Sequence, residues 1–265
     1  MNVIEDWYTN KYDEWSRLDR HKIEFEITKR YMDTYIPDAP LDILDIGGGP
    51  GRYSLYLAEK GHRVTLLDLS QHHIDIAKEK SCELGIPLVD YVKGDALELE
   101  AFPSEKYDVI LLMGPLYHLT KEEDRRKAIE GAMRLLKKGG ILITSFISRY
   151  APMLDTFSYL EFDENEEEVK GLLHYLEDGY NEDGNGFTTA YFIGIEEAQS
   201  IMADYDLKQL VFAGVENILS CKEREIYALS KKDYDKCIEL GYALSQDKNI
   251  LGCSLHFLYI GQKSS

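Results

Sequence analysis

The sequence lacks the features that mark several other classes of protein. Its four cysteines (Cys82, Cys221, Cys237 and Cys253) have neither CxxC nor zinc-ligand spacing. This predicts separate thiols in a reducing compartment and no metal site. No apolar run reaches the roughly 20 residues that a membrane helix requires, and the polar, acidic start of the chain is unlike a signal peptide. We therefore expect a cytoplasmic protein without a membrane partner.

Basic patches are also missing. The chain has 48 acidic and 30 basic residues, a formal net charge of −18, and Lys and Arg residues scattered among Glu and Asp. So acidic a field repels the phosphate backbone of a nucleic acid. Hydrophobic residues make up 44% of the 265 residues, which is enough for a full core. The sequence predicts one domain over 1–265, no nucleic-acid partner and an oligomeric state that stays open.

Apolar segments alternate with helical patterns over the first 147 residues. Segments rich in leucine and β-branched residues predict strands at 41–46, 62–69, 89–97, 107–113 and 141–147, and two more follow at 207–215 and 254–263. Strands that alternate with helices form right-handed βαβ units. We therefore expect an α/β fold with a doubly wound, mostly parallel seven-stranded sheet and helices on both faces.

Helical periodicity is clearest before the first of these strands. Apolar residues recur at Ile23, Ile27, Tyr31 and Tyr35, and the pattern stops before Pro37. Further helices are expected at 52–61, 70–85, 120–138, 195–205 and 222–245. The third of these should begin at a capping box formed by Thr120 and Glu123 and should end at the sequence KKGG.

Residues 148–193 interrupt the alternation of strands and helices. They contain acidic stretches at 161–168 and 177–186, together with leucine and aromatic residues such as Phe157 and Leu173, so parts of the segment should pack. Long loops in compact domains are usually functional or disordered. We expect this insertion, which follows the fifth strand, to be a substrate cap within the same domain.

The most specific motif is the glycine-rich stretch LDIGGGPGRY at 44–53. A phosphate-binding P-loop requires Lys and Ser or Thr after its glycines, and they are missing here. A dinucleotide fingerprint requires glycine where this chain has Arg52. The chain instead has the pattern D-x-G-x-G-x-G over 45–51, in which glycines without Cβ atoms let a ligand approach the backbone.

This spacing resembles motif I of the class I S-adenosylmethionine-dependent methyltransferases. Three further signals follow in the family's order: Asp68 at the end of the second strand, GDA at 94–96, and MGPLYHL at 113–119. The passage RLLKKGGILI into the fifth strand is also similar. The resemblance is strong over 41–147 and looser over the last two strands. The nearest likeness is to the ubiquinone/menaquinone-biosynthesis-like group of small-molecule enzymes.

The resemblance implies where S-adenosylmethionine binds. Asp68 would accept hydrogen bonds from the ribose, Asp95 would face the adenine amino group, and the glycine turn would lie along the methionine and ribose. The expected cofactor-binding residues are Asp45, Gly47, Gly48, Gly49, Gly51, Asp68, Leu69, Asp95, Ala96, Met113 and Gly114. The resemblance also implies an N-terminal helical lid over 1–36. Its candidate residues are Tyr8, Tyr12, Trp15 and Arg20, each of which could equally belong to a helix packed for stability.

The resemblance implies transfer of a methyl group by in-line displacement, which leaves S-adenosylhomocysteine and depends mainly on alignment. His118 is the expected catalytic base and Tyr117 the residue that orients the acceptor, although a structural hydrogen bond and a pocket roof remain alternatives. The [ND]PP[YF] motif of amino-methyltransferases is absent, because the chain has MGPL at 113–116. We expect a small-molecule acceptor. A methyltransferase acting on protein or RNA, or a catalytically silent cofactor-binding protein, remains possible.

Overall fold

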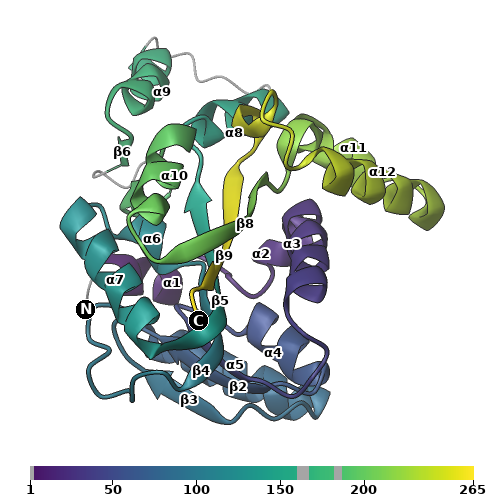
Figure 1. The fold of residues 1–265 in the computed structure, drawn as a ribbon. Helices are drawn as coiled ribbons and strands as arrows, with labels where there is room; N and C mark the ends of the chain where they lie inside the picture. Colours follow the sequence, from purple (N-terminus) through teal and green to yellow (C-terminus); the bar gives the residue numbers. More distant parts are fainter. Residues whose placement is uncertain (1–2, 160–166, 182–186) are drawn as a thin grey trace.

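The computed structural model describes residues 3–159, 167–181 and 187–265. Its centre is a seven-stranded sheet in the order β3-β2-β1-β4-β5-β9-β8 (Figure 1). The strands are β1 (Asp42–Ile46), β2 (Arg63–Asp68), β3 (Asp90–Lys93), β4 (Tyr107–Leu112), β5 (Leu136–Ile147), β8 (Leu207–Gly214) and β9 (His256–Lys263). The first five are parallel, and β9 runs antiparallel to both β5 and β8. The predicted fold class is confirmed.

The direction of winding reverses at β1. In the parallel ladders on either side of this strand, Leu44 lies opposite Thr65 of β2 and Ile110 of β4. Ligands of open α/β sheets bind outside the carboxyl ends of the strands at such a reversal. The loops that leave β1, β2 and β4 therefore reach the edge of the sheet where a ligand would be expected.

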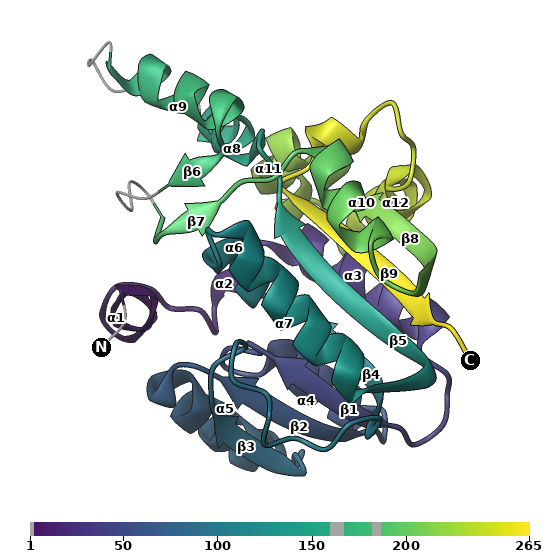
Figure 2. The ribbon, with the colours of Figure 1, turned by 60° about the vertical axis from the view of Figure 1, so that its left-hand side comes forward.

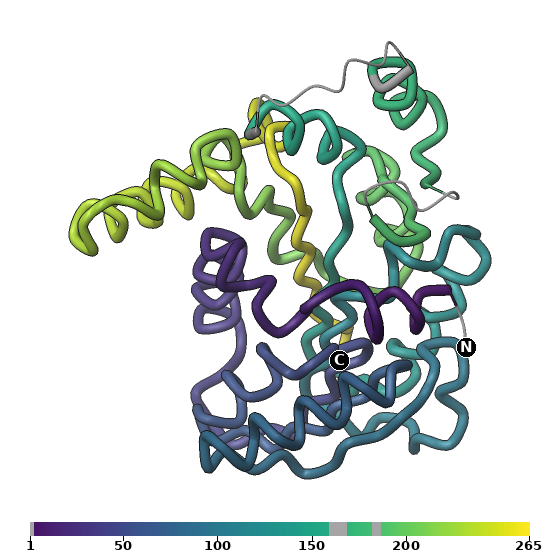
Figure 3. The backbone as a smooth tube through the Cα atoms, turned by 180° about the vertical axis from the view of Figure 1, so that it is seen from behind, coloured from purple at the N-terminus to yellow at the C-terminus, as the bar shows by residue number. Residues whose placement is uncertain are grey.

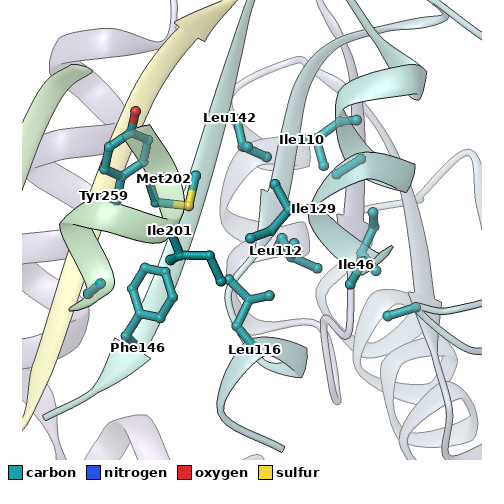
Figure 4. Packing of buried hydrophobic residues seen from close by; sticks show 14 of the residues in the cluster. Ile46, Ile110, Leu112, Leu116, Ile129, Leu142, Phe146, Ile201, Met202 and Tyr259 are labelled. Carbon is teal, nitrogen blue, oxygen red and sulfur yellow. The ribbon is translucent and has the colours of Figure 1, made fainter. Parts of the chain in front are cut away.

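Helices cover both faces of the sheet. On one face lie α3 (Lys22–Tyr35), α4 (Arg52–Glu59), α5 (Gln71–Leu84) and α12 (Lys231–Leu244), and on the other α7 (Glu122–Leu135) and α10 (Ile195–Ala203). Successive strand residues point to opposite faces, so Leu111 packs in the first core and Leu112 in the second. Figure 4 shows the second core, where Ile129, Ile201 and Met202 gather around the strands.

Two local predictions were wrong. Thr120 and Glu123 form no capping box, because the helix is capped at Lys121 without a side-chain hydrogen bond. That helix also ends at Leu135, so that the KKGG sequence already belongs to β5.

A third correction concerns the helix expected at 222–245, which is two helices. The first, α11 (Glu223–Tyr227), ends before α12 begins at Lys231. The side chain of Ser230 accepts a hydrogen bond from the backbone N–H of Asp233. An N-terminal cap of this kind favours a new helix start over continuation of the preceding one.

The segment 148–193 contains α8 (Ala151–Tyr159), α9 (Glu167–Glu177) and a small sheet of β6 (Tyr180–Asn181) and β7 (Ala190–Tyr191). The residues 161–166 and 182–186 of its acidic stretches lie outside the described residues. Figure 2 shows α9 projecting from the rest of the chain. Parts of the segment pack as expected, since Tyr175 and Phe187 lie against a cluster of buried residues, whereas Phe157 and Leu173 are more than half exposed. Within the described ranges, no helix has the length and apolar character that a membrane crossing requires.

Candidate functional site

A cavity of about 370 Å³ lies at the carboxyl ends of the central strands. Every predicted site residue lines it except Gly51. The lining set is Asp45, Gly47, Gly48, Gly49, Asp68, Leu69, Asp95, Ala96, Met113, Gly114, Tyr117 and His118. These residues come from the ends of β1, β2, β3 and β4, which explains how positions up to 73 residues apart reach one site.

Gly51 has a packing role. Its φ is +89°, and a Cβ atom added there would lie 3.1 Å from Leu66 Cδ1 and 3.4 Å from the Cβ of Ala77. Gly51 therefore lets the start of α4 approach β2 and α5, and it does not line the cavity.

The glycine turn has its other close approaches inside the site. A Cβ atom on Gly47 would lie 2.6 Å from Pro115 Cδ, and one on Gly48 would lie 2.6 Å from Asp45 Oδ2. Gly49 has a φ of +56°, and its missing Cβ would point toward Glu14 and His73, both in the cavity wall. Side chains are excluded here by the neighbouring loops and by the backbone conformation.

The carboxylate of Asp68 fixes the shape of this turn. Its Oδ2 accepts a hydrogen bond of 2.8 Å from the backbone N–H of Gly49, and its Oδ1 accepts one of 2.8 Å from the N–H of Ser70. Oδ1 also lies 3.2 Å from Nδ1 of His73. Oδ2 has a second lone pair, so Asp68 can still accept a hydrogen bond from a ligand.

Asp45 lies beneath the turn and is 3% exposed. It accepts a hydrogen bond of 2.7 Å from the hydroxyl of Ser54. Burial raises the pKa of Asp45 to about 7, the nearby charge of Asp68 adds to this effect, and the hydrogen bond from Ser54 opposes it. The cavity therefore has a carboxyl group that changes its charge near neutral pH.

His118 lies in the short helix α6 (Pro115–His118) and is held from two sides. Its Nδ1 is 3.1 Å from the carbonyl oxygen of Thr189, and its Nε2 is 2.9 Å from the hydroxyl of Tyr8. A carbonyl can only accept, so we assign the proton to Nδ1 and the lone pair to Nε2. Burial lowers the pKa of His118 to about 4, against a smaller opposite effect of the Thr189 carbonyl. The imidazole is thus a neutral acceptor facing the cavity.

Helix α1 (Val3–Asn10) forms part of the cavity wall, and Figure 3 shows the purple N-terminal segment crossing the molecule. Ile4, Glu5 and Tyr8 line the cavity, and the ring of Tyr8 also lies 5.1 Å from that of His73. The other lid candidates, Tyr12, Trp15 and Arg20, do not line it. They support neighbours instead: Tyr12 lies edge-on to Tyr8, and Trp15 lies under the guanidinium of Arg52.

Sequence reasoning missed one end of the cavity. Arg17, Glu24, Ser145 and His256 line it together with Glu14 and Tyr53. Arg17 donates to both oxygens of Glu24, at 2.7 and 3.0 Å, and to Glu14 at 2.8 Å. Arg17 lies on the short helix α2 (Arg17–Arg20), Glu24 on α3, Tyr53 on α4, Ser145 on β5 and His256 on β9, and Glu14 lies in the turn before α2. No motif marks them, although the predicted start of the last strand, at 254, could have drawn attention to His256.

Glu24, Glu216 and His256 hold their oxygen and nitrogen atoms within 4.8 Å of one another. Arg17 already occupies both oxygens of Glu24, and Nδ1 of His256 lies 2.6 Å from Glu216. Attraction to Arg17 and His256 outweighs burial and lowers the pKa of Glu24 to about 2. The arrangement is a hydrogen-bonded ion network, because the atoms that a metal ion would require are committed to these partners.

The wall fits S-adenosylmethionine in two respects. The glycine turn leaves backbone open to close approach, and Asp45, Asp68 and Asp95 provide the acceptors that suit a ligand with positive charge and hydroxyl groups. Two buried atoms of the wall, Oε2 of Glu14 and Nε2 of His73, also have no partner among the described residues. Buried polar atoms of this kind are usually satisfied, so a ligand is expected to contact them.

A family model described as a methyltransferase domain matches residues 43–140. This match covers the glycine turn, Asp68, Asp95 and His118. Over these residues the chain matches the methyltransferase domain family, which confirms the resemblance to S-adenosylmethionine-dependent methyltransferases that the sequence predicts.

The chain resembles curated relatives over about half of its length. It is 34% identical over 128 residues to an S-adenosyl-L-methionine-dependent Diels-Alderase of Talaromyces variabilis, a match covering 48% of this chain and 43% of the relative. It is 35% identical over 121 residues to the ubiquinone/menaquinone biosynthesis C-methyltransferase UbiE of Vibrio vulnificus, with 44% of each chain covered. The chain thus spans less than half the length of these relatives.

Similarity in fold extends further than similarity in sequence. A crystal structure of a SAM-dependent methyltransferase from Methanosarcina mazei matches 88% of this chain and 97% of its own, with a TM-score of 0.59 and 20% identity. The fold outside 43–140 therefore also follows the methyltransferase pattern.

Proposed function

We propose that the protein binds S-adenosylmethionine in the cavity and transfers its methyl group to a small-molecule acceptor, leaving S-adenosylhomocysteine. The observation that carries this proposal is that the glycine turn, Asp68, Asp95 and His118 line one cavity. The match of residues 43–140 to a methyltransferase domain supports the choice of cofactor. The four cysteines are free thiols, which supports a cytoplasmic location.

The cofactor supplies an activated methyl group when it is bound. In this proposal Asp68 holds the ribose, Asp95 the adenine end and the glycine turn the methionine portion. Met113 and Gly114, which directly follow β4, would lie beside the reacting centre. The protein contributes mainly alignment, which can be worth roughly 7–11 kcal/mol of the barrier. In this proposal α1, whose Tyr8 lines the cavity, also keeps water away from the reacting centre.

The acceptor is proposed to be small because α1 covers the cavity and because a net charge of −18 disfavours nucleic acids. We further propose that the segment 148–193 caps the acceptor. Its support is indirect: Thr189 contacts His118, and the ring of Phe187 stacks on that of His118 at 5.7 Å. No described residue of the segment lines the cavity itself.

Calorimetry with S-adenosylhomocysteine and with NAD tests the cofactor assignment. Tighter binding of NAD would contradict it. A screen of small metabolites with S-adenosylmethionine, followed by measurement of released S-adenosylhomocysteine, then tests the transfer. A Diels-Alder cyclisation, the activity named for the Talaromyces relative, transfers no methyl group. Product formation without S-adenosylhomocysteine would therefore favour that second function.

A further inference from the structure

The cavity has an end that the cofactor motifs do not use. The predicted cofactor residues lie at the ends of β3, β2, β1 and β4, whereas Ser145 and His256 lie past them on β5 and β9. Neighbouring strands are about 4.8 Å apart, so β9 is two strand spacings from β4. An acceptor molecule beside the methyl group at β4 therefore has room to reach His256.

His256 is held as a base would be. Its Nδ1 lies 2.6 Å from Oε1 of Glu216, while its Nε2 has no hydrogen-bond partner among the described residues. Glu216 is 0% exposed, and its Oε2 accepts hydrogen bonds from the Ser254 hydroxyl at 2.7 Å and from the backbone N–H of His256 at 2.9 Å. A carboxylate that accepts from Nδ1–H leaves the lone pair on Nε2, and this orientation by a third group is typical of a catalytic base.

We propose that His256 is the catalytic general base of this methyltransferase, that Glu216 positions it, and that the acceptor carries a hydroxyl group. The inference rests on the proposed function. In the reaction, the acceptor O–H gives its proton to Nε2 of His256 while the oxygen forms a bond to the methyl carbon. The bond between methyl and sulfur breaks, and its electron pair stays on the sulfur.

The charges around His256 distinguish it from His118. Burial lowers the pKa of His256, and repulsion by Arg17 also lowers it. Attraction to Glu24 and Glu216, together with the hydrogen bond to Glu216, outweighs these two effects. The pKa of His256 is therefore raised above its usual value. A base is most effective when its pKa lies near the working pH. The pKa of about 4 makes His118 a weaker base and suits it to accept a hydrogen bond.

Histidine NMR tests the dyad without any acceptor. In protein with ¹⁵N-labelled histidine, His256→Gln assigns the resonance of His256. We expect this residue to titrate above pH 6.5 and to carry its proton on Nδ1 in the neutral form. Glu216→Gln should lower that pKa and move the proton to Nε2, with a thermal melt to verify folding. A neutral form with the proton on Nε2 in the wild type, or a pKa at or below 6.5, would overturn the proposal.

Turnover is measured as released S-adenosylhomocysteine across a panel of phenols, catechols and aliphatic alcohols, with tertiary amines as acceptors that have no proton to lose. We expect a hydroxyl acceptor, and a rate that rises with pH through the pKa of His256. His256→Gln should reduce it about 10²–10⁴-fold and abolish that pH dependence, while the exposed His72→Gln serves as control. Turnover of tertiary amines alone, or an unchanged pH profile in His256→Gln, would overturn the proposal.

Measuring the binding of S-adenosylhomocysteine distinguishes a failure of this inference from a failure of the proposed function. His256→Gln should bind it within a few-fold of the wild type, because His256 lies past the cofactor strands. Failure of the wild-type protein to bind it would contradict the proposed function, whereas normal binding with a wrong histidine tautomer would contradict only the dyad.

Discussion

The hydroxyl of Tyr8 donates a hydrogen bond to Nε2 of His118, 110 residues further along the chain, over a distance of 2.9 Å. The partner on the other side of the imidazole is the carbonyl of Thr189. Three separate segments, the N-terminal helix, the loop after β4 and the insertion, thus meet at one histidine. In this closed arrangement the lone pair of His118 is occupied by the protein itself, so that an acceptor would have to displace Tyr8 to use it.

Replacing Tyr8 with phenylalanine should loosen α1 without changing the aromatic packing. A net hydrogen bond contributes about 0.5–1.5 kcal/mol, so the closed state should weaken by a factor of roughly 2–10. We expect faster dissociation of S-adenosylhomocysteine in stopped-flow measurements and faster hydrogen exchange over 3–10. Tyr12→Phe is the matched control, because the Tyr12 hydroxyl makes no hydrogen bond with the described residues. Equal dissociation rates for Tyr8→Phe and the wild type would show that this contact does not hold the helix closed.

Asp68→Ala should weaken S-adenosylhomocysteine binding by roughly 1.5–3 kcal/mol, the range for hydrogen bonds to a charged group. From the sequence alone, folding is expected to be unaffected, because Asp68 ends a strand. The structure changes this expectation, since Asp68 also accepts from the N–H groups of Gly49 and Ser70. We therefore expect a lower melting temperature as well. Calorimetry and thermal melts measure the two effects, and wild-type affinity in the variant would place the ribose elsewhere.

Gly49→Ala should lose cofactor affinity in addition to stability. Its φ of +56° is unfavourable for alanine, and the new methyl group would point into the cavity near Glu14 and His73. Gly85→Ala is the control, because Gly85 has a φ of +68° but no atom within 4 Å of its missing Cβ. Both variants should lose stability by at least about 1 kcal/mol. Only Gly49→Ala should bind S-adenosylhomocysteine more weakly, and equal affinities would place the ligand away from the turn.

The cofactor half of the cavity could be predicted because its residues lie at or just after the carboxyl ends of strands. Asp68 ends β2, and Asp95 comes two residues after β3. Parallel strands bring such positions to one edge of the sheet. Gly51 shares the spacing of the motif and is therefore expected in the site, but the packing shows that Leu66 and Ala77 lie against it.

The other half could not be predicted because its residues meet only after folding. Arg17 and Glu24 come from the helices before the sheet, and His256 begins the last strand. Glu24 and His256 come close only because α3 lies near the start of β9 in the folded chain. No local sequence pattern predicts this packing. The break before α12 was missed for a comparable reason, because the helical periodicity of 222–245 continues through the cap at Ser230.

The aromatic contacts of the segment 148–193 allow a test of its proposed role in acceptor binding. The ring of Phe187 lies 5.7 Å from that of His118 and 6.5 Å from that of Trp7, so it joins the insertion to both the site and α1. Phe187→Ala should reduce turnover of the acceptor and leave the affinity for S-adenosylhomocysteine within a few-fold. Phe157→Ala, at an exposed position of the same segment, is the control. Equal turnover in the two variants would argue against a role for the insertion in acceptor binding.

Asp45 should make the stability of the protein depend on pH. Its pKa of about 7 in the folded state lies above the value of 3.8 for an unperturbed aspartate, so the folded state binds the proton more tightly than the unfolded chain does. The stability that this proton contributes is fully present below pH 3.8 and is lost as the pH rises through about 7. Asp45→Asn removes the titration. The free energy of unfolding of the wild type should therefore fall relative to that of Asp45→Asn, by a few kcal/mol between pH 4 and pH 8. Denaturant unfolding at the two pH values measures this change.

The matched control for this titration is Asp75→Asn, because Asp75 is exposed on α5. The free energy of unfolding of Asp75→Asn should differ from that of the wild type by a constant amount over the same pH range. An exposed carboxylate gains little from folding at any pH. Parallel curves for Asp45→Asn and the wild type would mean that Asp45 is ionised throughout. The buried carboxylate would then have to be stabilised by more than the hydroxyl of Ser54, because a single neutral donor does not offset the cost of burying a charge.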